Sequence, residues 1–328
     1  MVTNFNGIHN LSRCLKSLQK TDYSEIKVIV VDCLTKNIDK WIKKTFPSVR
    51  IIHFDYDIGP SASHNVGLLN ASGEYVAFLD NDTEVTNNWL DEAVWILRNN
   101  PDVAVVQCKL LQMSNRKRLD RAHNFIDKFG FGVQLGVGEE DVGQYDNVQE
   151  VFYADGAAFI VKRDVAENAL VERNMFDPTY IIYYDETDFC WRIHLMGYKI
   201  VFAPNAVVYH ARTMSTMKNL PARLVFHHSK NRLATLIKNY SIGNLIKYVS
   251  ILLALEVCRA IILLRTKPEH SIAIFKAICR DLLDLKNLWR TRLTIQSFIR
   301  KVPDSSYLYL IRNPNLMTLY RNFKKYYL

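Results

Sequence analysis

The chain has 328 residues, enough for one large domain or two ordinary ones. Hydrophobic residues make up 49% and charged residues 23% of it, which excludes an intrinsically disordered chain. Its six cysteines are scattered, with no C-x-x-C pair and no zinc spacing. We therefore expect reduced thiols in a cytoplasmic protein, and not a disulfide framework.

Charge is unevenly distributed along the chain. Residues 1–211 contain 21 Lys and Arg against 28 Asp and Glu, a net charge of −7, whereas residues 212–328 contain 21 against 5, a net charge of +16. This asymmetry predicts two functional parts, which we place at residues 1–215 and 216–328. The basic part could meet nucleic acid or an anionic membrane surface. It contains no known basic-aromatic module, so we expect no nucleic-acid partner.

Short apolar runs alternate with helical patterns in the first part. The runs predict strands at 1–3, 26–31, 49–54, 75–79 and 103–108. Helical patterns lie between them, the clearest at 11–20 and 89–99. The alternation predicts an α/β fold with a doubly wound, mostly parallel sheet.

The pattern then changes twice. Residues 113–149 are rich in Gly and mixed charge, and we expect a long functional loop there. Periodicity returns at 151–161, followed by a predicted short helix at 189–196 and strands at 199–202 and 206–209. After His210 only long helices are predicted.

The clearest chemical signal is a pair of carboxylates, Asp80 and Asp82, directly after the apolar run 75–79. In an open α/β sheet, ligands bind at the carboxyl ends of the strands. Carboxylates there suit Mg²⁺ or Mn²⁺ shared with the phosphates of a substrate. Asp32 also ends a predicted strand, and we expect it to face the same crevice.

Two further segments could carry chemistry. Residues 59–67 form a small-residue loop before a helix, which lets backbone N–H groups approach phosphate. It is not a Walker loop. Asp185, Glu186 and Asp188 follow two tyrosines, and crowding of these carboxyls would raise the pKa of one of them toward a value useful for a general base.

The segment 245–264 is as apolar as a membrane span but carries Lys247, Glu256 and Arg259. Because charges are costly near a bilayer centre, we do not expect it to cross a membrane. Two interpretations remain: a core helix of a C-terminal bundle, or an amphipathic helix lying on a membrane surface.

Several short motifs occur in a fixed order over residues 1 to about 215. They are Asn4-Phe5-Asn6-Gly7, Val31-Asp32, residues 59–67, Leu79 to Asp82, Asp185 to Asp188 with Cys190-Trp191-Arg192, and Gly197-Tyr198, Pro204 and His210. In this order and spacing the chain resembles family 2 glycosyltransferases, in particular their rhamnosyltransferase-like branch for cell-envelope polysaccharides. The resemblance implies a GT-A fold, here with a C-terminal helical extension, and inverting transfer of a sugar from a nucleotide-diphosphate donor.

The resemblance also implies roles for residues. Asp80, Asp82 and His210 would hold a divalent metal, Mn²⁺ or Mg²⁺. Glu186 matches the position of the catalytic base, with Asp185 as the second candidate. The nucleotide-sugar would contact Asn4, Asn6, Asp32, Gly59, Asn65, Asp80 and Asn81. The acceptor side would include Asp155, Gly156, Asp188, Trp191 and Arg192.

The expected partners are a UDP-, dTDP- or GDP-linked sugar donor and a glycan or lipid-linked acceptor. The basic C-terminal part would place the protein peripherally on the cytoplasmic face of an anionic membrane, and its helices could pair into a homo-oligomer. Two alternatives use the same metal site: a nucleotidyltransferase, or a hydrolase of nucleotide-sugars.

Overall fold

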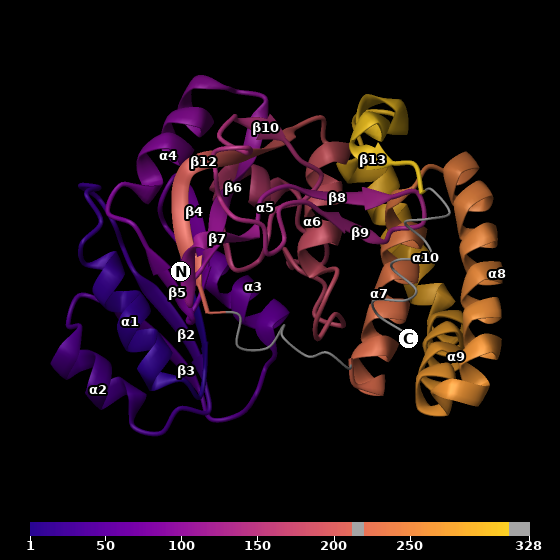
Figure 1. The fold of residues 1–328 in the computed structure, drawn as a ribbon, viewed down its shortest axis with the longest axis horizontal. Helices are drawn as coiled ribbons and strands as arrows, with labels where there is room; N and C mark the ends of the chain where they lie inside the picture. Colours follow the sequence, from indigo (N-terminus) through magenta and orange to yellow (C-terminus); the bar gives the residue numbers. More distant parts are fainter. Residues whose placement is uncertain (212–219, 315–328) are drawn as a thin grey trace.

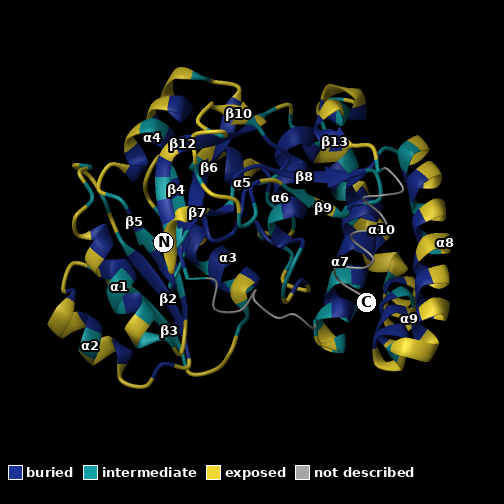
Figure 2. Cartoon of the chain, in the orientation of Figure 1, coloured by how far each residue is buried: buried dark blue, intermediate teal, exposed yellow. Residues whose placement is uncertain are grey.

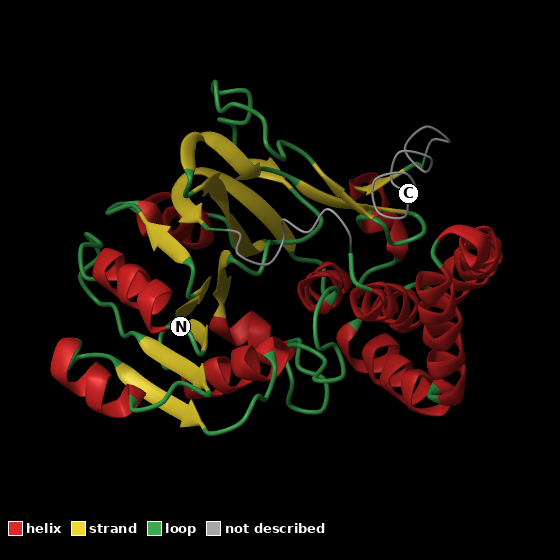
Figure 3. Ribbon diagram, turned by 60° about the horizontal axis from the view of Figure 1, so that its bottom comes forward, coloured by secondary structure: helices red, strands yellow, loops and turns green. Residues whose placement is uncertain are grey.

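The computed structural model describes residues 1–211 and 220–314. A large sheet with helices on both faces forms one half of the molecule, and the C-terminal helices gather at the other end (Figures 1 and 3). The predicted boundary between the two parts, at residues 215 and 216, lies outside the described residues.

The main sheet has the order β10-β12-β6-β11-β4-β1-β2-β3, with β5 paired to β12 and β7 to β6. Strands β3, β2, β1 and β4 run parallel, β11 is antiparallel between β4 and β6, and β12 runs parallel to β6. The strands are β1 (Val2–Phe5), β2 (Ile29–Cys33), β3 (Arg50–Phe54), β4 (Tyr75–Asp80), β5 (Thr83–Val85), β6 (Val103–Gln112), β7 (Asn115–Arg121), β10 (Gln149–Glu150), β11 (Ala158–Lys162) and β12 (Lys199–His210).

Helices cover the sheet on both sides. The apolar faces of α1, α2 and α4 share one buried cluster with the sheet, and residues of α3, α5 and α6 share a second cluster. The helices are α1 (Ile8–Leu18), α2 (Ile38–Thr45), α3 (Pro60–Asn70), α4 (Trp89–Asn99), α5 (Arg163–Asn168) and α6 (Asp185–Leu195). The prediction of a doubly wound, mostly parallel α/β sheet is thus confirmed.

The parallel register brings the polar strand ends to one edge of the sheet. Asn4 lies opposite Asp32, and Thr3 lies opposite Asp80. His210 ends β12, which runs in the same direction as β6 and, through β11, as β4. The carboxyl edge therefore collects side chains from four strands.

The structure corrects two local predictions. The two strands expected at 199–202 and 206–209 are one strand, β12, whose pairing with β6 shifts register between Ala203 and Val207. Pro204 lies in this segment and has no N–H to donate to a neighbouring strand, so the sequence predicts a break between two strands. The backbone instead forms a bulge within one strand. The helix expected from residue 189 begins earlier, at Asp185.

The loop expected at 113–149 was also wrong in part. It contains β7 and two strands of a second small sheet, β8 (Asn124–Asp127) and β9 (Gly132–Gln134), completed by β13 (Ile311–Arg312). The first four residues of β7 are exposed and include three basic side chains. Charged side chains on an edge strand prevent it from pairing with other chains. They also replace the alternating apolar residues by which a strand is recognised in a sequence.

The C-terminal part consists of long helices, as predicted. They are α7 (Ala222–Asn239), α8 (Ile242–Thr266), α9 (Pro268–Leu283) and α10 (Leu285–Thr294), followed by a π-helical turn at Ile295–Ile299 and 3-10 turns at Asp304–Ser306 and Leu308–Leu310. Helix α7 packs against α6, α9 and α10. Figure 2 shows it buried between the sheet and the outer helices.

Buried charges join α7 to the sheet half. The ammonium of Lys238 lies 2.9 Å from Asp177 and 3.0 Å from Asp188, and its side chain is 1% exposed. Asn239 donates to Asp188 at 2.8 Å. Both carboxylates depend on this one cation and its neighbours for compensation, since unpaired buried charges are strongly unfavourable.

Substitution of Lys238 by Met should destabilise the fold. The variant keeps the bulk of the side chain but leaves Asp177 and Asp188 without their shared cation, so we expect a loss of about 3–5 kcal/mol in the free energy of unfolding. Chemical denaturation followed by circular dichroism measures it. Lys276→Met, at an exposed position of α9, is the matched control. Equal stability of the two variants would contradict the assigned role of the cluster.

Candidate functional site

Three side chains at the carboxyl edge form a candidate metal centre. One potential ligand atom from each of Asp80, Asp82 and His210 lies within 4.8 Å of the others. Asp80 ends β4, Asp82 lies in the following turn, and His210 ends β12. Two carboxylates and an imidazole are a donor set that suits a divalent transition ion such as Mn²⁺.

His210 is oriented by a second carboxylate. Its Nδ1 lies 2.8 Å from Asp120, and its Nε2 lies 3.3 Å from Asp82. An imidazole whose one nitrogen is held by a carboxylate presents the other nitrogen in a fixed direction, as metal-binding histidines do. Burial opposes protonation of His210, but the hydrogen bonds to Asp120 and Asp82 outweigh it and raise its pKa to about 10.

The pKa of Asp80 is raised as well, which for a carboxyl group favours the neutral form. Its burial, and then the charge of Asp82, raise its pKa to about 7. The hydroxyl of Thr3 donates to it at 3.1 Å and offsets only part of this cost. The positive charge of His210 also lowers the pKa of Asp80, so a cation beside the two carboxylates stabilises them, as a bound divalent ion would.

A second group of side chains lies at the ends of β1, β2 and β3. Asp32 is fully buried and accepts hydrogen bonds from Asn4 and from Thr35 (2.6 Å), and its other oxygen lies 2.7 Å from His53. Asn4 in turn accepts from Asn81, which connects this group to the turn that holds Asp82. Asn6 follows β1 at the same edge, exposed and with a positive φ of 43°.

The loop before α3 is built around Gly59 and Pro60. Gly59 has φ of 79°, a left-handed conformation that favours glycine, and Pro60 occupies the first helical turn. Ser61 donates to Tyr180 or to Asp185, which lies 3.0 Å away. Asn65 is turned inward, where it donates to Phe176 at 2.8 Å and accepts from its N–H at the same distance.

Helix α6 begins with the acidic cluster. Tyr183 and Tyr184 both have φ near 70°, and this left-handed turn starts the helix at Asp185. Acidic residues are stabilised in a first helical turn because the N-terminal end of the helix dipole is positive. Asp185 is buried beneath Ser61, whereas Glu186 is only partly buried.

Glu186 lies directly against Gly156. A Cβ atom at position 156 would come within 1.9 Å of a carboxyl oxygen of Glu186, so only glycine leaves that carboxyl in its place. Burial, and then the charge of Asp185, raise the pKa of Glu186 well above its usual value. Asp155 adds a further negative charge from the same turn.

Strand β7 connects the two sides of the site. Its last two residues are Asp120, which holds His210, and Arg121, which forms a buried ion pair with Asp155. Asp155 also accepts from the N–H of Ala157 at 3.1 Å, which fixes the turn containing Gly156. One short strand therefore positions both the candidate metal ligand and the turn that faces Glu186.

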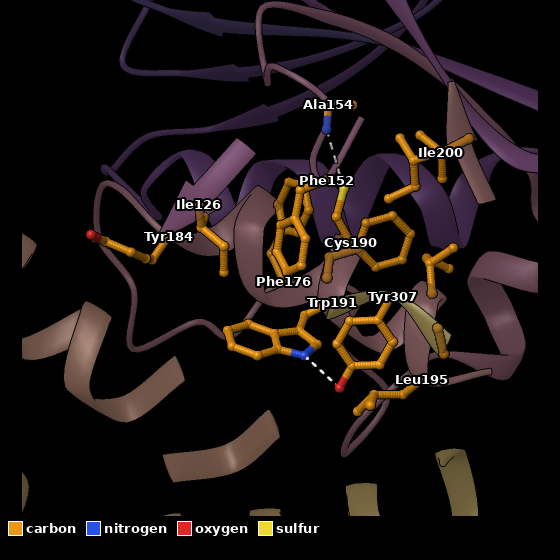
Figure 4. Packing of buried hydrophobic residues seen from close by; sticks show 14 of the residues in the cluster. Ile126, Phe152, Ala154, Phe176, Tyr184, Cys190, Trp191, Leu195, Ile200 and Tyr307 are labelled. Carbon is orange, nitrogen blue, oxygen red and sulfur yellow. Dashed lines mark hydrogen bonds between the residues drawn. The ribbon is translucent and has the colours of Figure 1, made fainter. Parts of the chain in front are cut away.

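The remaining predicted residues of α6 are buried with protein partners. Trp191 donates to the Tyr307 hydroxyl at 3.2 Å, and Cys190 accepts from the Ala154 N–H at 3.4 Å (Figure 4). Arg192 donates to two backbone carbonyl oxygens, and Asp188 pairs with Lys238. These contacts hold α6 against its surroundings.

Sequence reasoning missed Asp120, Arg121 and His53. The first two lie in a segment that was expected to be a loop, and a neighbouring acidic and basic residue is too common a pattern to identify a site. His53 lies on β3 opposite Asp32, and only the strand register reveals that it meets this carboxylate.

Comparisons with known proteins agree with this architecture. The model of the family described as glycosyl transferase family 2 matches residues 1–170. The UDP-, GalNAc- and Mn²⁺-bound structure of GalNAc-T7 superposes with a TM-score of 0.59 at 14% identity, covering 87% of this chain and 57% of that one. The mannosyltransferase PcManGT from Pyrobaculum calidifontis, with GDP-Man and Mn²⁺, gives 0.51 at 17% identity over 86% and 87% of the two chains.

Two curated relatives cover smaller parts of the chain. The pre-mycofactocin glycosyltransferase of Mycobacterium tuberculosis is 26% identical over 213 residues, 62% of this chain and 40% of its own length. The GalNAc(5)-diNAcBac-PP-undecaprenol beta-1,3-glucosyltransferase of Campylobacter jejuni is 33% identical over 95 residues, 27% of this chain and 31% of its own. The family model spans more than half of the chain, and the solved structures share its fold. The chain belongs to glycosyl transferase family 2 and has the GT-A fold of glycosyltransferases.

Proposed function

We propose that this chain transfers a sugar from a nucleotide-diphosphate donor to an acceptor hydroxyl with inversion at the anomeric carbon. The observation that carries the proposal is the cluster of Asp80, Asp82 and His210 at the same sheet edge as Asp32. Asp155 connects it to Glu186, because the charge of Asp155 raises the pKa of both Asp80 and Glu186. Structural neighbours solved with UDP, GDP-Man and Mn²⁺ support a nucleotide-sugar and a divalent ion.

The donor side is formed by the strand ends. Asp32, fixed by Asn4, Thr35 and His53, would bind the base or ribose of the nucleotide. The backbone N–H groups at Gly59, with Asn6 and Asn81, would line the path toward the diphosphate. Asn65 would act indirectly, by holding α3 to residues 174–176.

Asp80, Asp82 and His210 would hold the divalent ion, which when bound offsets negative charge on the departing diphosphate. Asp120 keeps Nε2 of His210 directed toward Asp82. An imidazole ligand favours Mn²⁺ over Mg²⁺, because Mg²⁺ prefers oxygen donors.

Glu186 would be the catalytic base, and two features support it over Asp185. Asp185 is buried and accepts a hydrogen bond from the hydroxyl of Ser61. Glu186, in contrast, is partly accessible and faces Gly156. The raised pKa of Glu186 makes its carboxylate a stronger acceptor for the proton of a hydroxyl. The hydroxyl oxygen then bonds to the anomeric carbon as the bond to the diphosphate breaks on the opposite face.

The acceptor would enter beside the turn of Asp155 and Gly156. Asp188, Trp191 and Arg192 would contribute by holding α6 in place. We propose a glycan or a lipid-linked glycan as acceptor, and a peripheral position on the cytoplasmic face of a membrane, where such lipids are reached.

Removal of one metal ligand tests the proposal directly. Asp82→Asn should lower Mn²⁺ affinity by about 100-fold or more, since even outer-shell changes cost 10–100-fold. Release of nucleotide diphosphate from a panel of UDP-, dTDP- and GDP-sugars should fall with it. Calorimetry measures the first and a coupled assay the second. Asp91→Asn, in the first turn of α4, is the control.

Retention of metal-dependent release by Asp82→Asn would contradict the assignment. Release without any acceptor would favour nucleotide-sugar hydrolysis, and release of pyrophosphate from a nucleoside triphosphate would favour the nucleotidyltransferase alternative.

Gly156→Ala tests the position of the base. The added methyl group must displace the carboxyl of Glu186, and a misplacement of about 1 Å can cost about 100-fold in rate. We expect kcat to fall while the affinity for the donor, measured by calorimetry, is unchanged. Gly243→Ala is the matched control, because a methyl group there meets open space. Unchanged kcat in Gly156→Ala would argue against Glu186.

Glu186→Gln should reveal how much stability the partly buried carboxyl of Glu186 costs. A folded-state pKa above the unfolded value means that the native state holds a proton which the unfolded chain has lost, so wild-type stability falls as pH rises through this interval. We expect the stability of Glu186→Gln over wild type to grow from pH 5 to pH 8, by at most about 1.4 kcal/mol per pH unit. Melting curves in chelator measure it, with Glu140→Gln as the exposed control. A gap independent of pH would contradict the shift.

A further inference from the structure

Helix α8 exposes many apolar side chains and buries two of its four charged residues. Glu256 and Arg259 lie on the inner face, 4% and 6% exposed, where they pair with each other and Glu256 pairs with Arg232 of α7. The outer face between residues 251 and 264 bears large aliphatic side chains: Ile251, Leu255, Val257, Ile261, Ile262 and Leu264. This is the reverse of the usual arrangement on a surface helix, which places its polar face outward.

The outer face is uninterrupted by charge. From 251 to 264 no exposed residue of α8 is charged, and Ile261 and Ile262 are each more than half exposed. The stretch is about 20 Å long at 1.5 Å per residue. Figure 2 shows this face along the outer rim of the molecule, away from the sheet. Exposed apolar surfaces of this extent mark a binding surface.

Exposed charge around this face is almost all positive. On α8, α9 and α10 the exposed ionic side chains are six basic ones and Glu269: the basic residues are Lys247, Arg265, Lys276, Arg280, Lys286 and Arg290. Lys247 and Arg265 lie at the two ends of the apolar stretch. Two copies packed antiparallel through this face would bring Lys247 of one against Arg265 of the other, which disfavours self-association. Anionic lipid complements the same charges.

A groove beside the face adds a second apolar feature. A cavity of about 340 Å³ opens between α7, α8, α9 and α10, and its rim includes Ile246, Leu282 and Trp289. Tryptophan is favoured at the boundary between lipid and water. The one carboxyl in its wall, Asp281, has its pKa raised to about 8 by burial, so it is mostly uncharged at neutral pH.

We infer that the outer face of α8, with the adjoining rim of the groove, is a docking surface for an anionic lipid bilayer. No helix in the described part of the chain has the length and apolarity to cross a membrane. The helix therefore lies in the plane of the interface, with its aliphatic side chains among the lipid chains and its terminal cations at the headgroups. The inference rests on the proposed peripheral position, and not on the transfer chemistry.

Vesicle binding tests the inference. The full chain is sedimented with sucrose-loaded vesicles of equal parts phosphatidylglycerol and phosphatidylcholine, and with vesicles of phosphatidylcholine alone. We expect binding to the anionic vesicles, weakened by salt. Ile261→Glu with Ile262→Glu should weaken it about tenfold or more, because it removes two aliphatic side chains from the bound face. Leu69→Glu with Val142→Glu, at exposed positions outside these helices, is the matched control and should bind like wild type.

A second variant keeps the test decisive if the first folds poorly. Lys247→Gln with Arg265→Gln leaves the aliphatic face intact and should weaken binding to anionic vesicles by about fivefold per residue. Wild type that stays unbound at low salt, or that binds no better than both double variants, would overturn the inference. So would a dimer in sedimentation that dissociates in the Ile261→Glu, Ile262→Glu variant without lipid binding. The loss of metal-dependent nucleotide release in Asp82→Asn, measured with acceptor and without vesicles, reports separately on the proposed activity.

Discussion

The antiparallel pairing of β5 with the end of β12 is the constraint on which the site depends. It places Thr83 opposite His210, and the N–H of Ala211 donates to the Asp82 carbonyl at 2.9 Å. Backbone hydrogen bonds, and not only side-chain packing, thus bring a histidine from far along the chain beside Asp80 and Asp82. The bulge between Ala203 and Val207 sets the register of this last stretch, so the geometry of the cluster depends on an irregularity well inside the strand.

Sequence patterns predicted the site residues whose position depends on a single strand or a single helix. Asp80 and Asp82 were found because carboxylates directly end an apolar run, and the doubly wound sheet followed from alternating patterns. His210 needed the family resemblance, since a lone histidine has no local signal. Adjacent Asp185 and Glu186 could not be separated by pattern, because which one faces the turn at Gly156 depends on tertiary packing. Strand β7 escaped detection because its exposed edge is charged.

Buried charge is used in two different ways in this molecule. Lys238 and Arg232 each meet carboxylates and are compensated, which ties α7 firmly to α6 and α8. At the carboxyl edge, in contrast, carboxyls of Asp80 and Glu186 are crowded and their pKa values are raised.

The position of strand β7 determines how this protein tolerates a change in chain length before residue 120. Its neighbouring residues Asp120 and Arg121 contact His210 and Asp155 respectively. A slip of one residue would reverse the facing of every side chain on the strand. Depending on its direction, the slip would offer either the guanidinium of Arg121 to His210 or the carboxylate of Asp120 to Asp155, and each is a mismatch of charge. We therefore expect a single-residue deletion in the hairpin joining β6 to β7, if it shifts this register, to disturb the site, although the hairpin itself lies at the surface.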